Sequence, residues 1–146
     1  MAAGINDYLI ERFGIEKKDI RTYSPLTLAY IGDAIFDVII RSILVNKGNT
    51  AVDKLHKRAS SIVKAQTQAE FVRVLTDVFT EEEADYYRRG RNSKPHTKAK
   101  NATTVEYLEA TGFEAVMGFL YLTDNMDRAC ELVNIGIERL GLDILK

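Results

Sequence analysis

The chain has 146 residues, enough for one domain of ordinary size and too few for two. Apolar residues make up 46% and charged residues 28%, the balance of a folded globular protein rather than a disordered one. The 20 Lys+Arg nearly cancel the 21 Asp+Glu, so the net charge of -1 by itself predicts no polyanionic partner. A single cysteine, Cys130, excludes an intrachain disulfide framework and favours the reducing cytoplasm. The longest uncharged stretch, from Thr22 to Gly32, is far shorter than the about 20 residues that span a bilayer, so no membrane association is expected.

The first strong helix signal is Ser24 followed by Pro25, a typical N-cap and first helical position. The apolar run that follows predicts a central, largely buried helix that ends near Gly48. Thr50 is expected to cap the next helix, and a further apolar pattern at helical spacing covers Ala65 to Val78.

The second half of the chain continues the helical pattern around one polar interruption. Thr80 and Glu83 have the spacing of a capping box, which predicts a short helix ending at Gly90. Residues 91–102 contain a proline and no large apolar side chain, so they are expected to form a loop. Two further helices are predicted, one capped by Thr103 with Glu106 and one from about Asn125 to Leu140 that ends before Gly141. With no alternating strand pattern, the sequence predicts an all-α fold of about seven helices.

Two carboxylates, Asp33 and Glu114, interrupt helices that should form the core. A charged carboxylate is rarely buried without a partner, because the loss of its hydration costs several kcal/mol. Small neighbours would let the two helices approach and the two carboxylates converge; they are Gly32, Ala34, Ala110, Gly112, Ala115 and Gly118. A convergent pair suits Mg²⁺ or Mn²⁺, which prefer oxygen ligands. The alternative is structural: Asp33 accepts a hydrogen bond from a neighbouring helix, and Glu114 reaches solvent or pairs with an arginine.

Asp37 lies one turn beyond Asp33, but Arg41 follows it at the i+4 position. This spacing predicts an ordinary helix ion pair rather than a functional carboxylate.

A basic segment without acidic residues runs from Arg88 to Lys100. Without its six basic residues, the chain has 14 Lys+Arg against 21 Asp+Glu, so the positive charge is localised. The segment has no aromatic residue for base stacking, which favours recognition of the phosphate backbone and shape of a duplex. A solvated loop is the structural alternative. The residues expected to contact RNA phosphates are Arg88, Arg89, Arg91, Asn92, Lys94, Lys98 and Lys100.

Two motifs in order resemble the ribonuclease III family. LAYIGDAIFD, which contains Asp33, is similar to the family's signature LEFLGDAVL, and FEAVMGFLYL, which contains Glu114, is similar to its second motif FEALIGAIYL. RRGRNSK and KAQTQA resemble the Mini-III subfamily, whose members consist of the catalytic domain alone. The resemblance covers roughly Ser24 to Leu140.

The resemblance implies a single catalytic domain over residues 1–146, with a basic loop at 88–102 and the helical bundle of the ribonuclease III endonuclease domain. It implies a cytoplasmic homodimer that cuts double-stranded RNA with Mg²⁺, or Mn²⁺ as a substitute, and leaves 5′-phosphate ends. The expected substrate is the 23S ribosomal RNA precursor, and whether a ribosomal protein assists is left open. Asp33 and Glu114 match catalytic, metal-binding residues of the family.

The match departs from the family pattern at two carboxylate positions. The family's glutamate four residues before the signature aspartate falls at Ala29, and its aspartate three residues before the final glutamate falls at Thr111. Fewer protein ligands predict weak metal binding without RNA. The same two replacements motivate an alternative function, a non-catalytic RNA-binding or ribosome-associated member of this fold.

Overall fold

The structure is a computed structural model that describes residues 4–93 and 104–144, and these residues form seven α-helices and one short 3-10 helix. Within these two ranges there is no β-strand, so the predicted all-α fold of about seven helices is confirmed. In chain order the elements are α1 (Ile5–Arg12), η1 (Ile20–Thr22), α2 (Pro25–Asn46), α3 (Val52–Val63), α4 (Ala65–Leu75), α5 (Glu81–Arg91), α6 (Thr104–Leu122) and α7 (Met126–Leu140).

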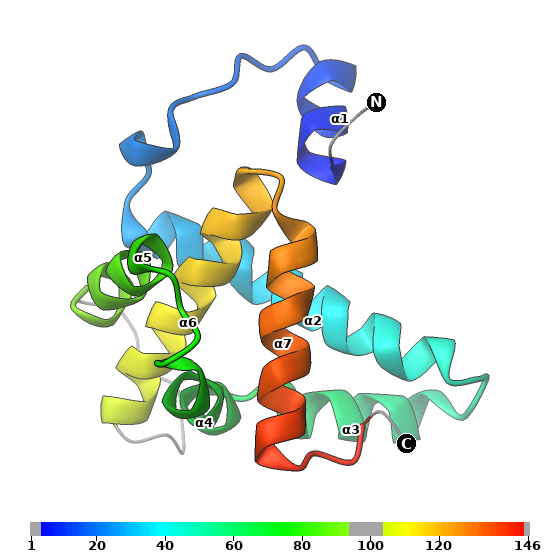
Figure 1. Ribbon diagram of the computed structural model, residues 1–146. Coiled ribbons are helices and arrows are strands. Elements are labelled where there is room, and N and C mark those ends of the chain that lie inside the picture. The colour runs from blue at the N-terminus through cyan, green and yellow to red at the C-terminus, as the bar shows by residue number, and fades with distance from the viewer. Residues whose placement is uncertain (1–3, 94–103, 145–146) are drawn as a thin grey trace.

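Helix α6 lies at the centre of the molecule and contacts α2, α4, α5 and α7 (Figure 1). From Ala110 to Tyr121 every residue of α6 except Glu114 is buried. A helix that is apolar on all sides is stable only when other elements surround it. Glu114 is therefore the one residue in this stretch of the central helix that is not fully buried.

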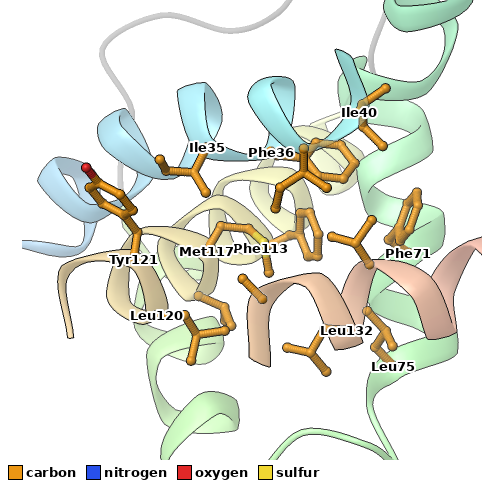
Figure 2. Close-up of a cluster of buried hydrophobic side chains, with 14 of the residues drawn as sticks. Ile35, Phe36, Ile40, Phe71, Leu75, Phe113, Met117, Leu120, Tyr121 and Leu132 are labelled. Carbon is orange, nitrogen blue, oxygen red and sulfur yellow. The ribbon is translucent and has the colours of Figure 1, made fainter. Parts of the chain in front are cut away.

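Three phenylalanine side chains pack α2, α4 and α6 against one another (Figure 2). Phe36 of α2 meets Phe71 of α4 and Phe113 of α6 edge to face, with ring centroids 5.4 and 5.1 Å apart. All three side chains are fully buried. Edge-to-face contacts add to the hydrophobic stabilisation and fix ring orientation, so this cluster sets how α2, α4 and α6 are placed relative to one another.

Several helix ends lie where the sequence predicts them. The Ser24 side chain accepts a hydrogen bond from the Thr27 amide at the start of α2. Thr80 and Glu83 form both bonds of a capping box at the start of α5. Gly141 ends α7 in the left-handed conformation, with φ of 66°. These three predictions are confirmed because each depends on local chemistry that the sequence displays directly.

Other boundaries differ from the prediction. Thr50 does not cap α3; Ala51 is the N-cap and makes no side-chain hydrogen bond. Helix α4 ends at Leu75 rather than Val78. Helix α5 continues through Gly90 to Arg91, because Gly90 packs directly on α6, where an added Cβ would lie 2.9 Å from the Gly112 Cα. The predicted cap Thr103 lies outside the described residues.

Helix α1 lies apart from the bundle at the end of an extended segment (Figure 1). It has no buried residue, and the Asn6 side chain ties it to the bundle by donating to the Leu122 carbonyl over 3.2 Å. None of the helices in the described ranges combines the length and apolar character needed to cross a membrane.

Helices α2 and α6 cross in direct backbone contact. A Cβ on Gly32 would lie 1.7 Å from the Glu114 carbonyl oxygen, and one on Gly118 would lie 1.9 Å from the Leu28 carbonyl oxygen. The predicted close approach is thus confirmed for these two glycines, whereas Ala34 is exposed and takes no part in the crossing. The contact places residue 33 of α2 beside residue 114 of α6.

Gly32→Ala is expected to lower the free energy of unfolding by about 2–3 kcal/mol, because the added methyl group must push the Glu114 backbone away. Urea unfolding followed by circular dichroism measures the change. Ser42→Thr adds a methyl group at an exposed position of the same helix and should cost far less. Equal stability of the two variants would contradict the close crossing.

Candidate active site

The two predicted carboxylates meet at the crossing of α2 and α6. Asp33 follows Gly32 on α2, and Glu114 is the residue whose backbone carbonyl Gly32 touches. Both side chains line one pocket and lie close enough for Asp33 to help raise the pKa of Glu114. The prediction that two carboxylates distant in the sequence converge is therefore confirmed by the geometry of the crossing.

Burial differs between the two carboxylates. Glu114 is only partly accessible, as expected, but Asp33 is exposed, so the prediction that both lie in the core is wrong for Asp33. The reason is the face of α2 on which Asp33 lies: its neighbour Ala34 is exposed as well, while the buried face continues through Ile35 and Phe36. The site is thus open on the α2 side and closed on the α6 side.

This asymmetry perturbs the titration of Glu114. Burial raises the pKa of the Glu114 carboxyl to about 9, and the hydrogen bond and negative charge of Asp33 contribute in the same direction. A hydrogen bond from the Gln68 side chain opposes the rise by favouring the charged form. At neutral pH, Glu114 therefore holds a proton unless a cation replaces it.

Both carboxylates line one pocket of about 390 Å³ between α2, α4 and α6. Ala29 and Thr111, the positions where the family pattern has further carboxylates, line the same pocket. The Thr111 hydroxyl donates to the Tyr107 carbonyl over 3.0 Å, so its proton is already engaged. The pocket therefore presents two carboxylates rather than four.

Of the structural alternatives for these carboxylates, the pairing of Glu114 with an arginine is not supported by the described part of the chain. Neither Asp33 nor Glu114 forms an ion pair with an arginine or lysine there. No group of three or more His, Cys, Asp or Glu side chains that could hold a metal occurs within residues 4–93 and 104–144. Among the described residues, Asp33 and Glu114 therefore have only each other as acidic partners in the pocket.

Gln68 of α4 is a site residue that sequence reasoning missed. Its side chain is buried, and Nε2 donates to the Val63 carbonyl at 2.7 Å and to Glu114 Oε2 at 3.4 Å. A signal was present, because Gln68 precedes Phe71 and Val72 by one helical turn and thus occupies a core-facing position. An uncharged polar residue at such a position requires partners, which the Val63 carbonyl of α3 and the Glu114 side chain of α6 supply.

Asp37 has the ordinary role predicted for it. Arg41 Nε donates to Asp37 Oδ1 over 3.1 Å, one turn along α2. Asp37 is therefore engaged in an ion pair outside the pocket.

The basic segment begins on a helix rather than in a loop. Arg88, Arg89 and Arg91 belong to the last turns of α5, where basic side chains complement the helix dipole, and Asn92 is the C-cap. This corrects the loop predicted from residue 88. Lys94, Lys98 and Lys100 lie outside the described residues.

The three arginines of α5 make local contacts. Arg88 pairs with Asp85, while the guanidinium groups of Arg89 and Arg91 lie 5.2 and 5.7 Å from the ring centres of Tyr86 and Tyr87. These cation–π contacts give Arg89 and Arg91 a stabilising role within α5 in addition to any role in RNA binding. The same turns of α5 pack, through Gly90, on α6 next to Glu114, which leaves the basic end of α5 close to the site.

Comparison with known proteins agrees with this arrangement. Residues 26–125 match the model of the Ribonuclease III domain. The fold also resembles a crystal structure of a Fusobacterium nucleatum protein, with a TM-score of 0.74 and 34% sequence identity over 84% of this chain and 98% of that chain. The class of protein is therefore a ribonuclease III domain.

Curated relatives narrow the assignment. The chain is 44% identical to the Mini-ribonuclease 3 of Enterococcus faecalis, over 85% of this chain and 96% of that protein. It is 43% identical to the Mini-ribonuclease 3 of Clostridium tetani, over 83% and 81% of the two chains. The chain belongs to the ribonuclease III family and, within it, to the Mini-ribonuclease 3 group.

The raised pKa of Glu114 predicts a pH-dependent stability without metal. Between about pH 4.5 and 9 the folded state keeps the Glu114 proton, whereas the unfolded state has lost it. Unfolding then releases a proton, so the free energy of unfolding falls as pH rises, by at most about 1.4 kcal/mol per pH unit from this group. Glu114→Gln removes this contribution and is expected to unfold with a flatter pH dependence.

Urea unfolding in EDTA at several pH values tests this expectation. The stability gained by Glu114→Gln over the unmodified protein should grow from pH 5 to pH 8. Glu138→Gln, at an exposed position of α7, is the control and should leave the pH profile unchanged. Parallel profiles for Glu114→Gln and the unmodified protein would show that Glu114 carries no proton at neutral pH.

Proposed function

We propose that the protein is a Mg²⁺-dependent endoribonuclease that cleaves double-stranded RNA and leaves 5′-phosphate ends. The observation that carries this proposal is the contact of Asp33 with Glu114 in an open pocket of a ribonuclease III domain. The proposed substrate is the 23S ribosomal RNA precursor, which places the activity in the cytoplasm.

The residues of the pocket fit a small divalent cation. Asp33 and Glu114 offer hard oxygen donors, and their contact is tolerated without a cation only because one of them retains a proton. Asp33 and Glu114 would hold Mg²⁺, or Mn²⁺ as a substitute. Such an ion, when bound, supplies activation of a water nucleophile and neutralises charge that develops on the phosphodiester.

The two carboxylates are suited to different parts of the task. Asp33 is exposed, so an RNA backbone laid across α2 can approach it directly. Glu114 is held by the buried α6 backbone and by the Gln68 side chain, so its carboxylate is positioned in advance. Pre-positioned charged groups stabilise a charged transition state without reorganisation during the reaction.

The proposed homodimer is supported by an apolar face of the same helix. Tyr30, Ala34, Val38 and Val45 recur along α2 at helical spacing and are all exposed; Tyr30 retains 83% of its accessible surface. An exposed apolar stripe on one helix is typical of a protein interface, and a two-fold dimer would bury the stripe against its own copy. Since α2 also carries Asp33, such a dimer would hold two sites in a fixed arrangement.

Asp33→Asn and Glu114→Gln are each expected to abolish cleavage, because each removes a charged oxygen donor while keeping the size of the side chain. Cleavage of a long labelled duplex RNA in Mg²⁺ measures the loss, and circular dichroism and RNA binding in EDTA should remain close to those of the unmodified protein. Asp37→Asn, one turn away on α2, is the matched control and should keep full activity.

The same assay separates the two functions considered from the sequence. An unmodified protein that binds the duplex but does not cut it in Mg²⁺ would favour the non-catalytic RNA-binding or ribosome-associated alternative. Cleavage at the normal rate by either acidic-site variant would contradict the catalytic assignment.

Binding by the basic segment predicts a change in salt dependence. Replacing Lys98 and Lys100 with glutamine should weaken duplex binding and reduce the slope of log K against log salt by about 1 for each lysine that neutralises a phosphate. The same double change at Lys54 and Lys57, exposed on α3, alters the net charge equally and is the control. An unchanged slope in the Lys98 and Lys100 variant would place the RNA elsewhere on the protein.

A further inference from the structure

Gln68 is an anomaly among the buried polar side chains. It is 2% exposed, and its Oε1 is the only buried side-chain oxygen or nitrogen in the described residues that has no hydrogen-bond partner. The other buried polar side chains are engaged: Thr67 donates to the Ser61 carbonyl, and Glu83 pairs with Arg128. Native proteins rarely leave a buried acceptor unsatisfied, so the Gln68 oxygen requires an explanation.

The orientation of the Gln68 amide is fixed by its nitrogen. Nε2 donates to the Val63 carbonyl over 2.7 Å and to Glu114 Oε2 over 3.4 Å. If oxygen and nitrogen were exchanged, the amide oxygen would lie 2.7 Å from the Val63 carbonyl oxygen, which would repel it. The nitrogen therefore points at Val63 and Glu114, and Oε1 is the end to which no group in the described residues donates.

The pocket beside Gln68 indicates what could satisfy Oε1. Gln68 lines the pocket that holds Asp33 and Glu114, and the remaining lining comes from Leu26, Ala29, Val63, Ala65 and Ala110 together with Tyr30, Tyr107 and Thr111. The Thr111 hydroxyl already donates elsewhere. A group that enters the pocket must therefore supply the positive charge or proton that a carbonyl oxygen attracts.

We propose that Gln68 is the third member of the cation site, with Oε1 as a neutral oxygen donor to the hydrated divalent ion and Nε2 as the group that positions Glu114. The inference rests on the proposed function, since it requires the cation. A neutral donor accounts for a site that works although Ala29 and Thr111 offer no carboxylate. It adds an oxygen to the site without adding a third negative charge beside Asp33 and Glu114.

The test measures Mn²⁺ affinity of the RNA-free protein by electron paramagnetic resonance of the free ion. Gln68→Leu keeps the approximate size but removes the oxygen, and is expected to weaken Mn²⁺ binding by about 10-fold or more, the usual effect of losing a supporting ligand. Gln66→Leu, an exposed position of the same helix, is the matched control and should change the affinity by less than about 2-fold.

Gln68→Glu distinguishes an oxygen donor from a merely structural side chain. It restores an oxygen and adds a charge, so the variant should bind Mn²⁺ at least as tightly as the unmodified protein, and Mn²⁺ should raise its melting temperature more. A structural role through the Val63 carbonyl predicts instead that both variants bind Mn²⁺ equally weakly. If Gln68→Leu does not fold, as judged by circular dichroism in EDTA, the glutamate variant decides alone, and weaker binding by it overturns the proposal.

Asp33→Asn separates this inference from the proposed function. If Asp33→Asn loses Mn²⁺ binding while Gln68→Leu keeps the affinity of the unmodified protein, the cation site stands and the role of Gln68 is overturned. If Asp33→Asn also binds Mn²⁺ normally, the cation site at the α2 and α6 crossing is wrong, and both proposals fail.

Discussion

The contact of the α2 backbone with the α6 backbone is the constraint on which the site depends. Gly32 and Gly118 leave no side chain between the two helices, so the carbonyls of Glu114 and Leu28 lie where Cβ atoms would otherwise be. Helices separated by ordinary side chains have axes about 8–10 Å apart. The closer approach brings a short aspartate on one helix within hydrogen-bonding reach of a glutamate on the other, and the phenylalanine cluster beneath holds the crossing in place.

This crossing makes the folded protein hold an unfavourable arrangement of charge. Two carboxylates in contact, one of them largely removed from water, cannot both be ionised without a cation. The protein tolerates the pair because Glu114 keeps a proton, and that proton is the occupant that a divalent cation would displace. Stability without metal and readiness for metal therefore depend on the same carboxyl group, which is typical of functional sites.

Much of the fold could be predicted from the sequence because its signals are local. Ser24 with Pro25, the pair Thr80 and Glu83, and Gly141 each fix a helix end through bonds to residues a few positions away. The role of Gly90 could not be predicted from such local signals. A glycine at that position resembles a helix end, but its role is to let α5 approach α6, which only the three-dimensional packing determines.

The candidate site was predictable in part for the same reason. Asp33 and Glu114 stand out because they are charged in apolar segments, and the neighbouring glycines indicate a close crossing. The exposure of Asp33 depends on which face of α2 the other helices leave uncovered, and the contact of Gln68 with Glu114 joins residues from two helices distant in the sequence. Neither the exposure of Asp33 nor the contact of Gln68 with Glu114 can be predicted from residues that are close in the sequence.

The replacement of two family carboxylates by Ala29 and Thr111 has a physical consequence for how the site would be filled. A pocket with two carboxylates carries less negative charge than one with four, so it attracts a divalent cation less strongly and repels a phosphate less strongly. The cation and the RNA backbone would then each improve the site for the other, since the phosphate adds the negative oxygens that the protein does not provide. Binding of each would then be thermodynamically linked to binding of the other, and by reciprocity the effect would be equal in both directions. Under the proposed function, a pocket built in this way would favour assembly of the complete site on RNA over retention of metal by the free protein.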